Sequence, residues 1–535
     1  MKKIFKNIPI LFSLLIVFTV SSCKDDLPEE ITELVTDRLF SPVGVEAKVI
    51  NKTQVVLNWT KNPKAESYVI EVYENDSLTF AGSPVMIFTN ITNDDIPDTI
   101  KSGLIGATQY SVRIKAVGSE IAESKWSAVY FKTGEEQIMN AVSEESVSAH
   151  SVKLTWKAGE TATKIILTAG QSTLEHVVTA EEIAAGEATL SGLIEDTDYT
   201  ARLMKDDKVR GSATFTTKID LNAANTIVVH PDEDLVVAIQ GAASGSRIVL
   251  VASDDGSNEF LKSAGQTINI DKGISIRGYL KSNKPTLHMQ FRLTAENASL
   301  TVKDVILNGQ SDADMRDHVV QLTQSVACGD ILFKDCIITN YGKSLISGAS
   351  GIAVSVRSFT IQNCKVSNIL TSSADCIDVR SGCIENATLL NSTFYNCAPD
   401  RDFFRLDDAS SSFPGKSTII KVNRCTFSKV NNDAARRLLY VRFANNEITF
   451  TNNVVANSVG YYTNQTATNI VLFNKNNYFN APNYLVYTGT ALNVKTDNSG
   501  TYLQQNPGFV DEANGNLTIT NATLLEQGIG ANISW

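Results

Sequence analysis

The stretch that decides the fold lies between residues 302 and 479, and it opens with the phrase Val302-Lys-Asp-Val305. Seven such phrases follow one another. Each has an apolar residue, a polar pair and a fourth, mostly small residue, and another apolar residue comes two positions later. The second member of the polar pair stands at positions 304, 335, 363, 391, 424, 452 and 476, so the spacings are 31, 28, 28, 33, 28 and 24 residues. This period, with β-type alternation inside each unit, indicates a solenoid whose stacked coils share one core.

Inside each repeat, the residues alternate as a strand with one buried face requires. Positions two apart face the same side of a strand, so the apolar residues form inward columns from coil to coil. The polar residue between them interrupts the strand as a turn residue does. We therefore expect parallel strands stacked coil on coil, with the first full coil at residues 271–278. The repeat asparagines are expected to form a ladder of amide hydrogen bonds: Asn363, Asn391, Asn452 and Asn476.

The pattern over residues 225–535 resembles the right-handed parallel β-helix of pectate-lyase-like proteins. The C-terminal sequence, with Asn506-Pro-Gly-Phe-Val510 and then Gly528-Ile-Gly-Ala-Asn-Ile-Ser-Trp535, resembles the closing segment of Bacteroides β-helix proteins. Those proteins occur in polysaccharide-utilisation systems, and most lack a defined activity. The resemblance therefore implies a fold and a link to complex polysaccharides, while the activity itself has to be argued from a site.

Two segments before the solenoid contain short alternating strands with turn residues between them. Residues 40–134 contain Val55-Val-Leu57-Asn-Trp59 and Leu104-Ile-Gly-Ala-Thr108-Gln-Tyr110. Residues 135–218 repeat the pattern more weakly, with Trp156 and Tyr199 at the corresponding places. A core tryptophan on the second strand and a Leu-x-x-x-Thr-x-Tyr corner resemble the fibronectin type III domain. The resemblance implies two β-sandwiches that act as spacers, with ligand binding by either one as the alternative. The predicted fold class is all-β: two sandwiches followed by a right-handed parallel β-helix.

The N-terminus has the composition of an export signal. Lys2, Lys3 and Lys6 precede an apolar run at residues 8–20, which is short for a membrane span and fits a signal peptide at residues 1–22. The following Ser21-Ser22-Cys23 resembles the lipobox of bacterial lipoproteins, which implies a lipid on Cys23. The acidic residues of the next segment, a tether at 23–39, resemble the surface-export signal of Bacteroidetes lipoproteins. The alternative is an ordinary cleaved signal in which the cysteine is coincidental.

Charge and cysteine usage exclude several classes of function. The formal net charge is −11 and the pI is about 5.2, which gives no general attraction to nucleic acid or to anionic membranes. Seven cysteines besides Cys23 lie in the solenoid, without a C-x-x-C pair, so neither a disulfide framework nor a zinc site is indicated. Cys336, Cys364 and Cys425 share one repeat position. We expect a column of buried thiols there, and one disulfide bridge is the alternative in an exported protein.

A second set of strands carries charged residues at the same place in successive coils. If Ile377, Phe404 and Leu439 point inward, the residues beside them point outward. One outward column is then formed by Asp378, Arg405 and Tyr440, and a second by Arg380, Asp407 and Arg442. Neighbouring strands are about 4.8 Å apart, so the side chains of a column touch.

This row has several interpretations. The simplest is a surface ladder of salt bridges that satisfies its own charges and stabilises little. The functional interpretation is a carbohydrate groove, in which arginine binds carboxylate or hydroxyl groups and Tyr440 contacts a sugar face. A glycoside hydrolase would need a carboxylate pair, and the only Asp-Asp pair beside this row is Asp407-Asp408.

A polysaccharide lyase would use the same row differently. It needs a base and a cation or arginine that neutralises a uronate carboxylate. The candidates for these roles are Arg380, Arg405, Arg442 and Lys343. Carboxylates are the ligands that Ca²⁺ prefers, and the residues that could hold it are Asp375, Asp378, Asp402 and Asp407.

Together these patterns predict a lipid-anchored protein of the outer membrane that faces the cell exterior. The leading function is binding of a complex polysaccharide, with a pectin-like glycan as one option. The alternatives are a lyase that cleaves a uronic-acid glycan by β-elimination and a structural or adhesive surface protein. The expected partners are a polysaccharide, the outer membrane and other glycan-uptake proteins, but not nucleic acid. Only the lyase alternative brings a cofactor, Ca²⁺, and whether the chain is an enzyme stays open.

Overall fold

A computed structural model describes residues 37–100 and 103–533. The predicted signal peptide, Cys23 and most of the tether lie outside the described residues. Among the residues that are described, none of the helices is both long and apolar enough to cross a membrane. The chain divides into two compact units, and the unit that holds the β-helix also includes Ser143–Val152 and Leu190–Asp198.

The first β-sandwich has three strands in one sheet and four in the other. Its antiparallel sheets have the orders β1-β2-β5 and β4-β3-β6-β7. The Tyr110 hydroxyl accepts a hydrogen bond from the Ile105 N–H at 2.9 Å, which is the predicted tyrosine corner. Trp59 is buried against Tyr68, with ring centroids 5.2 Å apart. The strands are β1 (Glu46–Ile50), β2 (Gln54–Asn58), β3 (Ser67–Glu74), β4 (Met86–Ile91), β5 (Asp98–Ile100), β6 (Gln109–Val117) and β7 (Ser127–Lys132).

The second sandwich repeats this plan with fewer strands. Four of them form an antiparallel sheet in the order β10-β9-β12-β13, and β8 pairs with β11. Trp156 is buried, and Tyr199 stacks on Phe215 with ring centroids 5.4 Å apart. Both fibronectin-III-like sandwiches predicted from the sequence are therefore confirmed as folds. The elements are β8 (Ser151–Thr155), β9 (Lys164–Ala169), β10 (Ser172–Val177), α1 (Ala180–Ala185), β11 (Glu187–Ser191), β12 (Asp198–Lys205) and β13 (Lys208–Thr216).

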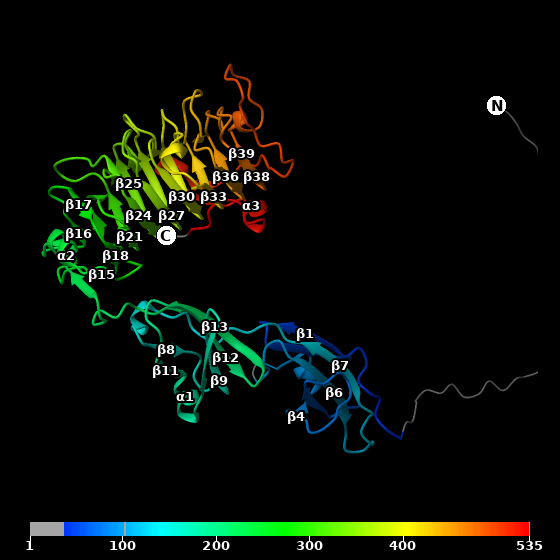
Figure 1. Ribbon diagram of the computed structural model, residues 1–535. Coiled ribbons are helices and arrows are strands. Elements are labelled where there is room, and N and C mark those ends of the chain that lie inside the picture. The colour runs from blue at the N-terminus through cyan, green and yellow to red at the C-terminus, as the bar shows by residue number, and fades with distance from the viewer. Residues whose placement is uncertain (1–36, 101–102, 534–535) are drawn as a thin grey trace, which may run out of the picture. The chain divides into compact units, whose positions relative to one another are not determined.

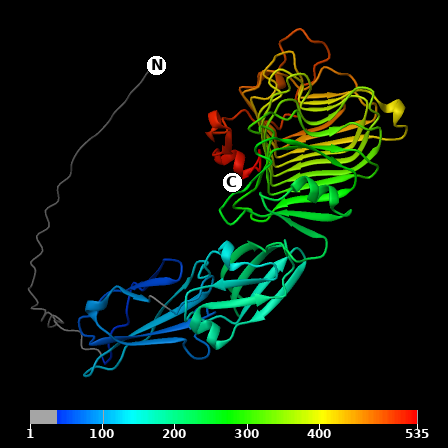
Figure 2. The ribbon, with the colours of Figure 1, turned by 90° about the vertical axis from the view of Figure 1, so that its left-hand side faces the viewer.

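The C-terminal part is a parallel β-helix with three sheets, as predicted (Figures 1 and 2). The first sheet contains β14 (Thr226–Val229), β15 (Ser246–Leu250), β18 (Gly273–Gly278), β21 (Ser299–Lys303), β24 (Ala327–Lys334), β27 (Ser355–Gln362), β30 (Cys383–Leu390), β33 (Thr418–Asn423), β36 (Asn446–Thr451) and β38 (Ile470–Asn474). The second contains β16 (Glu259–Phe260), β19 (Thr286–Leu287), β22 (Ile306–Asn308), β25 (Ile337–Tyr341), β28 (Lys365–Ile369), β31 (Thr393–Cys397), β34 (Thr426–Ser428), β37 (Val454–Ala456) and β39 (Asn477–Phe479). The third contains β17 (Gln266–Ile270), β20 (Met289–Leu293), β23 (His318–Leu322), β26 (Ser344–Gly348), β29 (Ile377–Val379), β32 (Phe404–Leu406) and β35 (Leu439–Val441).

Shorter elements complete this domain. Helix α2 (Leu235–Gly241) buries Leu235 and Ile239 at the first coils. The strands β40 (Phe509–Asp511) and β41 (Asn516–Ile519) pair antiparallel and precede helix α3 (Ala522–Glu526). Single 3₁₀ turns lie at Asn93–Asp95, Glu144–Ser146, Ser410–Ser412, Pro482–Tyr484 and Glu512–Asn514. The prediction that the first full coil starts at residue 271 is wrong by one coil, because β15, β16 and β17 already contribute one strand to each sheet without the repeat phrase.

The repeat phrase marks a turn between the first and second sheets. Its second polar residue adopts the left-handed backbone conformation, with φ between 45° and 57° at positions 304, 335, 363, 391, 424 and 452. Asparagine and aspartate tolerate this conformation better than most residues. Asn391 donates to Asn363 at 2.9 Å and Asn363 donates to Asp335 at 3.1 Å, so this part of the predicted ladder is confirmed. Asn452 instead donates to Asn423 at 3.0 Å, because an arginine stands at position 424.

The prediction that Asn476 joins this ladder is wrong. Val454 pairs with Asn477, so Asn476 lies beside Asn453 rather than Asn452. Lys475 therefore takes the left-handed position, with φ 48°. Asn476 is buried instead, and its side-chain oxygen accepts the Asn453 N–H at 3.0 Å.

A second asparagine ladder lies at the C-terminal ends of the strands of the second sheet and was not predicted. Its members also have left-handed backbone, with φ between 49° and 60°. Asn396 donates to Asn368 at 2.9 Å, and Asn368 donates to Asn340 at 3.2 Å. The ladder positions are Asn340, Asn368, Asn396, Asn457 and Asn480. In the coils that they join, the two ladders link neighbouring turns and thereby help to hold the strands in register.

The core between the sheets is apolar and contains the cysteines. All seven cysteines of the described residues are buried and free. Cys336, Cys364 and Cys425 lie at the predicted common position, and burial raises the pKa of the Cys425 thiol to about 12. The prediction of a buried column of reduced thiols is confirmed, and the disulfide alternative is not realised.

Candidate functional site

The predicted outward row lies on three consecutive strands of the third sheet. In the parallel register, Asp378 pairs with Arg405 and Arg405 pairs with Tyr440. In β32 and β35 the flanking residues are buried while Arg405 and Tyr440 are half-buried, so these two side chains face outward as predicted. Asp378 is only 4% exposed, like its neighbours in β29. We call this surface the Arg/Asp face; its members are Asp375, Asp378, Arg380, Arg401, Asp402, Arg405, Asp407, Arg437, Tyr440 and Arg442.

Asp375 lies at the centre of the face, just before β29. Its side chain is 1% exposed, and three guanidinium groups surround it. The nearest nitrogens are Arg401 Nε at 3.2 Å, Arg405 Nη1 at 3.3 Å and Arg380 Nη2 at 3.6 Å. The N–H of Asp402 also donates to Asp375, at 3.1 Å. A buried carboxylate needs such partners, since an unpaired buried charge is costly.

Three arginines of the face each bind a carboxylate with two nitrogens. Arg380 binds Asp378 at 2.9 and 2.8 Å, and Arg405 binds Asp407 at 3.0 and 2.9 Å. The third pair, Arg437 and Asp402, has distances of 2.9 and 2.6 Å. Two parallel N–H···O bonds hold a guanidinium in one orientation. The face is therefore rigid before any ligand arrives.

The carboxylates also change the acid–base properties of these arginines. The hydrogen bond with Asp378 raises the pKa of Arg380 above its usual value. Burial alone would lower the pKa of Arg405, but Asp407 and Asp375 raise it. Burial would also lower the pKa of Arg437, but the hydrogen bond and the charge of Asp402 together raise it above its usual value. All three side chains therefore stay protonated.

Tyr440 contributes the aromatic surface of the face, and its side chain is half-buried. Guanidinium carbons lie over its ring at 4.6 Å for Arg437, 5.1 Å for Arg405 and 6.0 Å for Arg442. Arg442 is exposed and donates to the Tyr440 hydroxyl at 3.3 Å. Cation–π contacts of this kind orient both groups.

Two parts of the predicted site are not formed as expected. Lys343 lies outside the two columns and forms an ion pair with Asp317 at 2.8 Å. The four carboxylates considered for Ca²⁺ bind arginines instead, and the described residues contain no group of three or more acidic, histidine or cysteine side chains that could hold a metal ion. The calcium alternative therefore has no support in this arrangement.

The structure adds residues that the sequence pattern did not single out. Arg401 and Arg437 bind the buried carboxylates from the turns before β32 and β35, where alternation gives no signal. The outward column also continues backwards along the third sheet through pairings of consecutive strands: Asn269, Arg292, Gln321, Ser347 and then Asp378. Arg292 Nη2 donates to Gln321 at 3.0 Å. Aligning the preceding coil of the sequence with Asp378 would have identified Ser347 as a member of this column.

The tyrosines downstream of the face belong to the core. Tyr461, Tyr462, Tyr478 and Tyr484 are each at most 3% exposed. The hydroxyls of Tyr462 and Tyr478 are 2.5 Å apart, and Tyr478 donates to Asp497 at 2.7 Å. These four tyrosines therefore pack inside the last coils and do not enlarge the Arg/Asp face.

Comparisons with known proteins find likenesses in both halves of the chain. Residues 255–397 match the model of a domain of unknown function, DUF4957, and residues 420–533 match that of a second one, DUF5123. A two-domain fibronectin type III segment of chicken tenascin is 15% identical, with a TM-score of 0.23, and covers 33% of this chain and 99% of that segment. The FN1–FN3 domains of chicken CNTN1 are 15% identical, with a TM-score of 0.16, and the match covers 34% of this chain and 68% of that one. Among curated proteins, no match was found.

Proposed function

We propose that the Arg/Asp face binds a polysaccharide, and that the protein displays this face outside the cell on two spacer domains. The observation that carries the proposal is the pair Arg405 and Tyr440 on neighbouring strands, in which a fixed, half-buried guanidinium lies beside a half-exposed aromatic ring. Guanidinium groups bind carboxylates or hydroxyls, and a ring edge or face packs on a sugar. Strands repeat about every 4.8 Å along the helix axis, so the face places a charged or aromatic group at each step along an extended polymer.

The anchoring part of this proposal rests on the sequence before residue 37. The lipobox-like Ser21-Ser22-Cys23 and the acidic residues after it support a lipid anchor at the outer membrane, with the chain facing outward. In that setting the partners would be the glycan and other proteins of glycan uptake. A pectin-like polymer is included because arginines of the face can bind uronate carboxylates.

The charge state of the arginines favours binding over β-elimination. A lyase base has to accept a proton, so an arginine or lysine in that role must be deprotonated when the substrate arrives. The carboxylates raise the pKa of Arg380, Arg405 and Arg437, which disfavours the neutral form. Lys343 lies outside the columns in an ion pair with Asp317. The lyase is therefore the weaker candidate.

A structural or adhesive role is the second candidate, and one observation favours it. Each carboxylate of the face already has an arginine partner, as in a ladder that satisfies its own charges. A binding face differs from such a ladder in having donors that can still reach a ligand. The exposed Arg442 guanidinium, with a single hydrogen bond to Tyr440, is such a group.

The test is affinity electrophoresis of the mature protein through gels that contain neutral, uronic-acid or sulfated polysaccharides. We expect at least one polysaccharide to retard the protein relative to a non-binding standard. The same mixtures are followed by ultraviolet absorbance for the unsaturated product of β-elimination, which we expect to be absent. Retardation with product formation would establish the lyase instead, and free migration in every gel would leave the structural role.

A further inference from the structure

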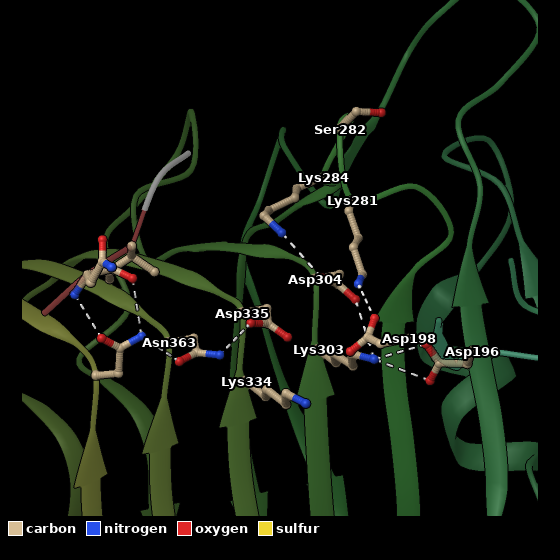
Figure 3. Close-up of a pocket in the computed structure, with 13 residues that line it drawn as sticks. Asp196, Asp198, Lys281, Ser282, Lys284, Lys303, Asp304, Lys334, Asp335 and Asn363 are labelled. Atoms are coloured by element: carbon tan, nitrogen blue, oxygen red, sulfur yellow. Dashed lines mark hydrogen bonds and ion pairs between the residues drawn. The ribbon is translucent and has the colours of Figure 1, made fainter. Parts of the chain in front are cut away.

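A polar pocket, shown in Figure 3, lies beside the ends of strands of the first sheet, whereas the Arg/Asp face lies on the third sheet. It is formed where the first asparagine ladder passes the ends of β21 and β24, and its volume is about 620 Å³. Pockets of this size commonly hold small ligands. Its lining residues all belong to the compact unit that contains the β-helix.

The ladder gives one wall of the pocket a fixed hydrogen-bonding pattern. The Asn532 N–H donates to Asn391 Oδ1 at 2.8 Å, which orients the Asn391 amide. Asn391 then donates to Asn363, and Asn363 donates to Asp335 Oδ1 at 3.1 Å. Asp335 Oδ2 accepts no hydrogen bond from the described residues, so it remains available to a ligand. The wall thus ends in a carboxylate oxygen whose position is fixed.

The charges around this wall are mostly neutralised within the pocket. Asp304 is 1% exposed and has Lys284 at 3.3 Å and Lys303 at 3.9 Å. Burial would raise the pKa of Asp196, but Arg277 and Lys303 lower it to about 2. Lys334 differs, because its ammonium forms neither a direct ion pair nor a hydrogen bond with any described residue, although its charge helps to lower the pKa of Asp198. Lys334 and Asp335 are adjacent in the chain, and Figure 3 shows both at the wall.

The residues that line the pocket include four lysines and four aspartates, so the lining itself carries equal numbers of the two charges; Arg277, which is buried behind it, pairs with Asp196 and Asp304. The pocket has a fixed acceptor in Asp335 Oδ2 and donors in Lys334 and in the remaining amide N–H of Asn363. A ligand that matches such a set is neutral and carries adjacent hydroxyl groups, each of which donates one hydrogen bond and accepts others. When the ligand displaces water from Asp335, Lys334 and Asn363, its hydroxyl groups would replace the hydrogen bonds that these side chains made to that water.

We propose that this pocket binds a neutral sugar unit, with Asp335 accepting hydrogen bonds from its hydroxyls and Lys334 and Asn363 donating to them. This site is independent of the polysaccharide site proposed for the Arg/Asp face. Its lining has no aromatic ring that could stack on a sugar, so the affinity comes from hydrogen bonds alone. We expect dissociation constants in the millimolar range.

The test is saturation-transfer NMR of the mature protein with neutral mono- and disaccharides, followed by titration of the strongest. Asp335→Asn keeps the ladder bond from Asn363, since asparagine occupies other ladder positions, but it weakens the acceptor. Lys334→Met removes the ammonium and keeps the chain length. We expect each variant to weaken binding about tenfold, which corresponds to about 1.4 kcal/mol. Asp330→Asn on the same strand is the matched control, because Asp330 binds Arg357 outside the pocket.

Three outcomes would overturn this proposal: no saturation transfer from any neutral sugar, binding of anionic sugars only, or equal affinity in wild type and both variants. Circular dichroism of each variant shows whether it has folded. If Asp335→Asn does not fold, Lys334→Met alone tests the proposal. Arg405→Ala should leave this signal unchanged. Failure of polysaccharide binding at the Arg/Asp face is therefore distinguishable from failure here.

Discussion

At the scale of single residues, the turns of the β-helix depend on side chains that tolerate left-handed backbone. Asn368 has φ 53°, donates to Asn340 and accepts from Asn396. An ordinary residue in this conformation costs roughly 1–2 kcal/mol, whereas glycine adopts it freely. The amide adds hydrogen bonds that alanine or glycine would lose.

Replacing Asn368 separates these two contributions. Asn368→Ala loses the ladder bonds and keeps the backbone strain, so we expect a loss of about 2–3 kcal/mol in unfolding free energy. Asn368→Gly loses only the bonds, and we expect it to cost about 1–2 kcal/mol. Urea denaturation of the mature protein measures both. Equal losses for the two variants would mean that backbone conformation contributes nothing at this turn.

The repeat phrase predicted these residues in the first ladder but not in the second. Its spacing identified the turn positions 304, 335, 363, 391, 424 and 452, and the structure shows that their backbone is left-handed. It failed at Asn476, because the left-handed turn of the last coil comes one residue earlier, at Lys475. The second ladder lacks a flanking phrase, so nothing in the pattern distinguished Asn340 or Asn396 from surface asparagines.

At the scale of elements, strand β23 of the third sheet carries a buried histidine. His318 is 6% exposed, and its Nδ1 has no partner among the described residues. Burial lowers the pKa of His318 to about 4; Asp317 and Asp378 oppose this shift, and Lys343 adds to it. The folded strand therefore holds the imidazole in its neutral form.

This histidine makes the β-helix sensitive to acid. In the unfolded chain an imidazole titrates near pH 6.5, so below that pH the unfolded state binds the proton first. Stability is present above about pH 6.5 and falls until about pH 4, by roughly 3 kcal/mol in total. Urea midpoints measured across this range should show the fall in wild type and a smaller one in His318→Leu. The half-exposed His230 gives the control His230→Leu, and an equal slope in all three proteins would contradict this origin.

Alternation within strands also predicted the outward columns of the third sheet. Asp378, Arg405 and Tyr440 follow directly from apolar neighbours that have to face the core. The role of Asp375 could not be predicted in this way, because it lies before β29 in a turn. Its burial depends on how three arginines from two neighbouring coils meet, and no local pattern contains that information.

At the scale of the whole molecule, two β-sandwiches precede a β-helix that carries two separate polar surfaces. The all-β class and the order of the folds were predictable, because each fold has its own strand spacing and turn residues. The pocket at Lys334 and Asp335 was not, since it needs the ladder, the C-terminal segment around Asn532 and several lysines in one place. Function is proposed first for the Arg/Asp face, where charge and an aromatic ring occur together.

The most direct test of this account compares variants of the face in a gel containing the polysaccharide that retards the wild-type protein. Tyr440→Ala and Arg405→Ala each remove one member of the column, and Arg357→Ala removes an exposed arginine that pairs with Asp330 on the first sheet. We predict that both face variants bind at least about tenfold more weakly, a change of about 1.4 kcal/mol, while Arg357→Ala is retarded like wild type. Retardation of Tyr440→Ala and Arg405→Ala equal to that of wild type would contradict the account.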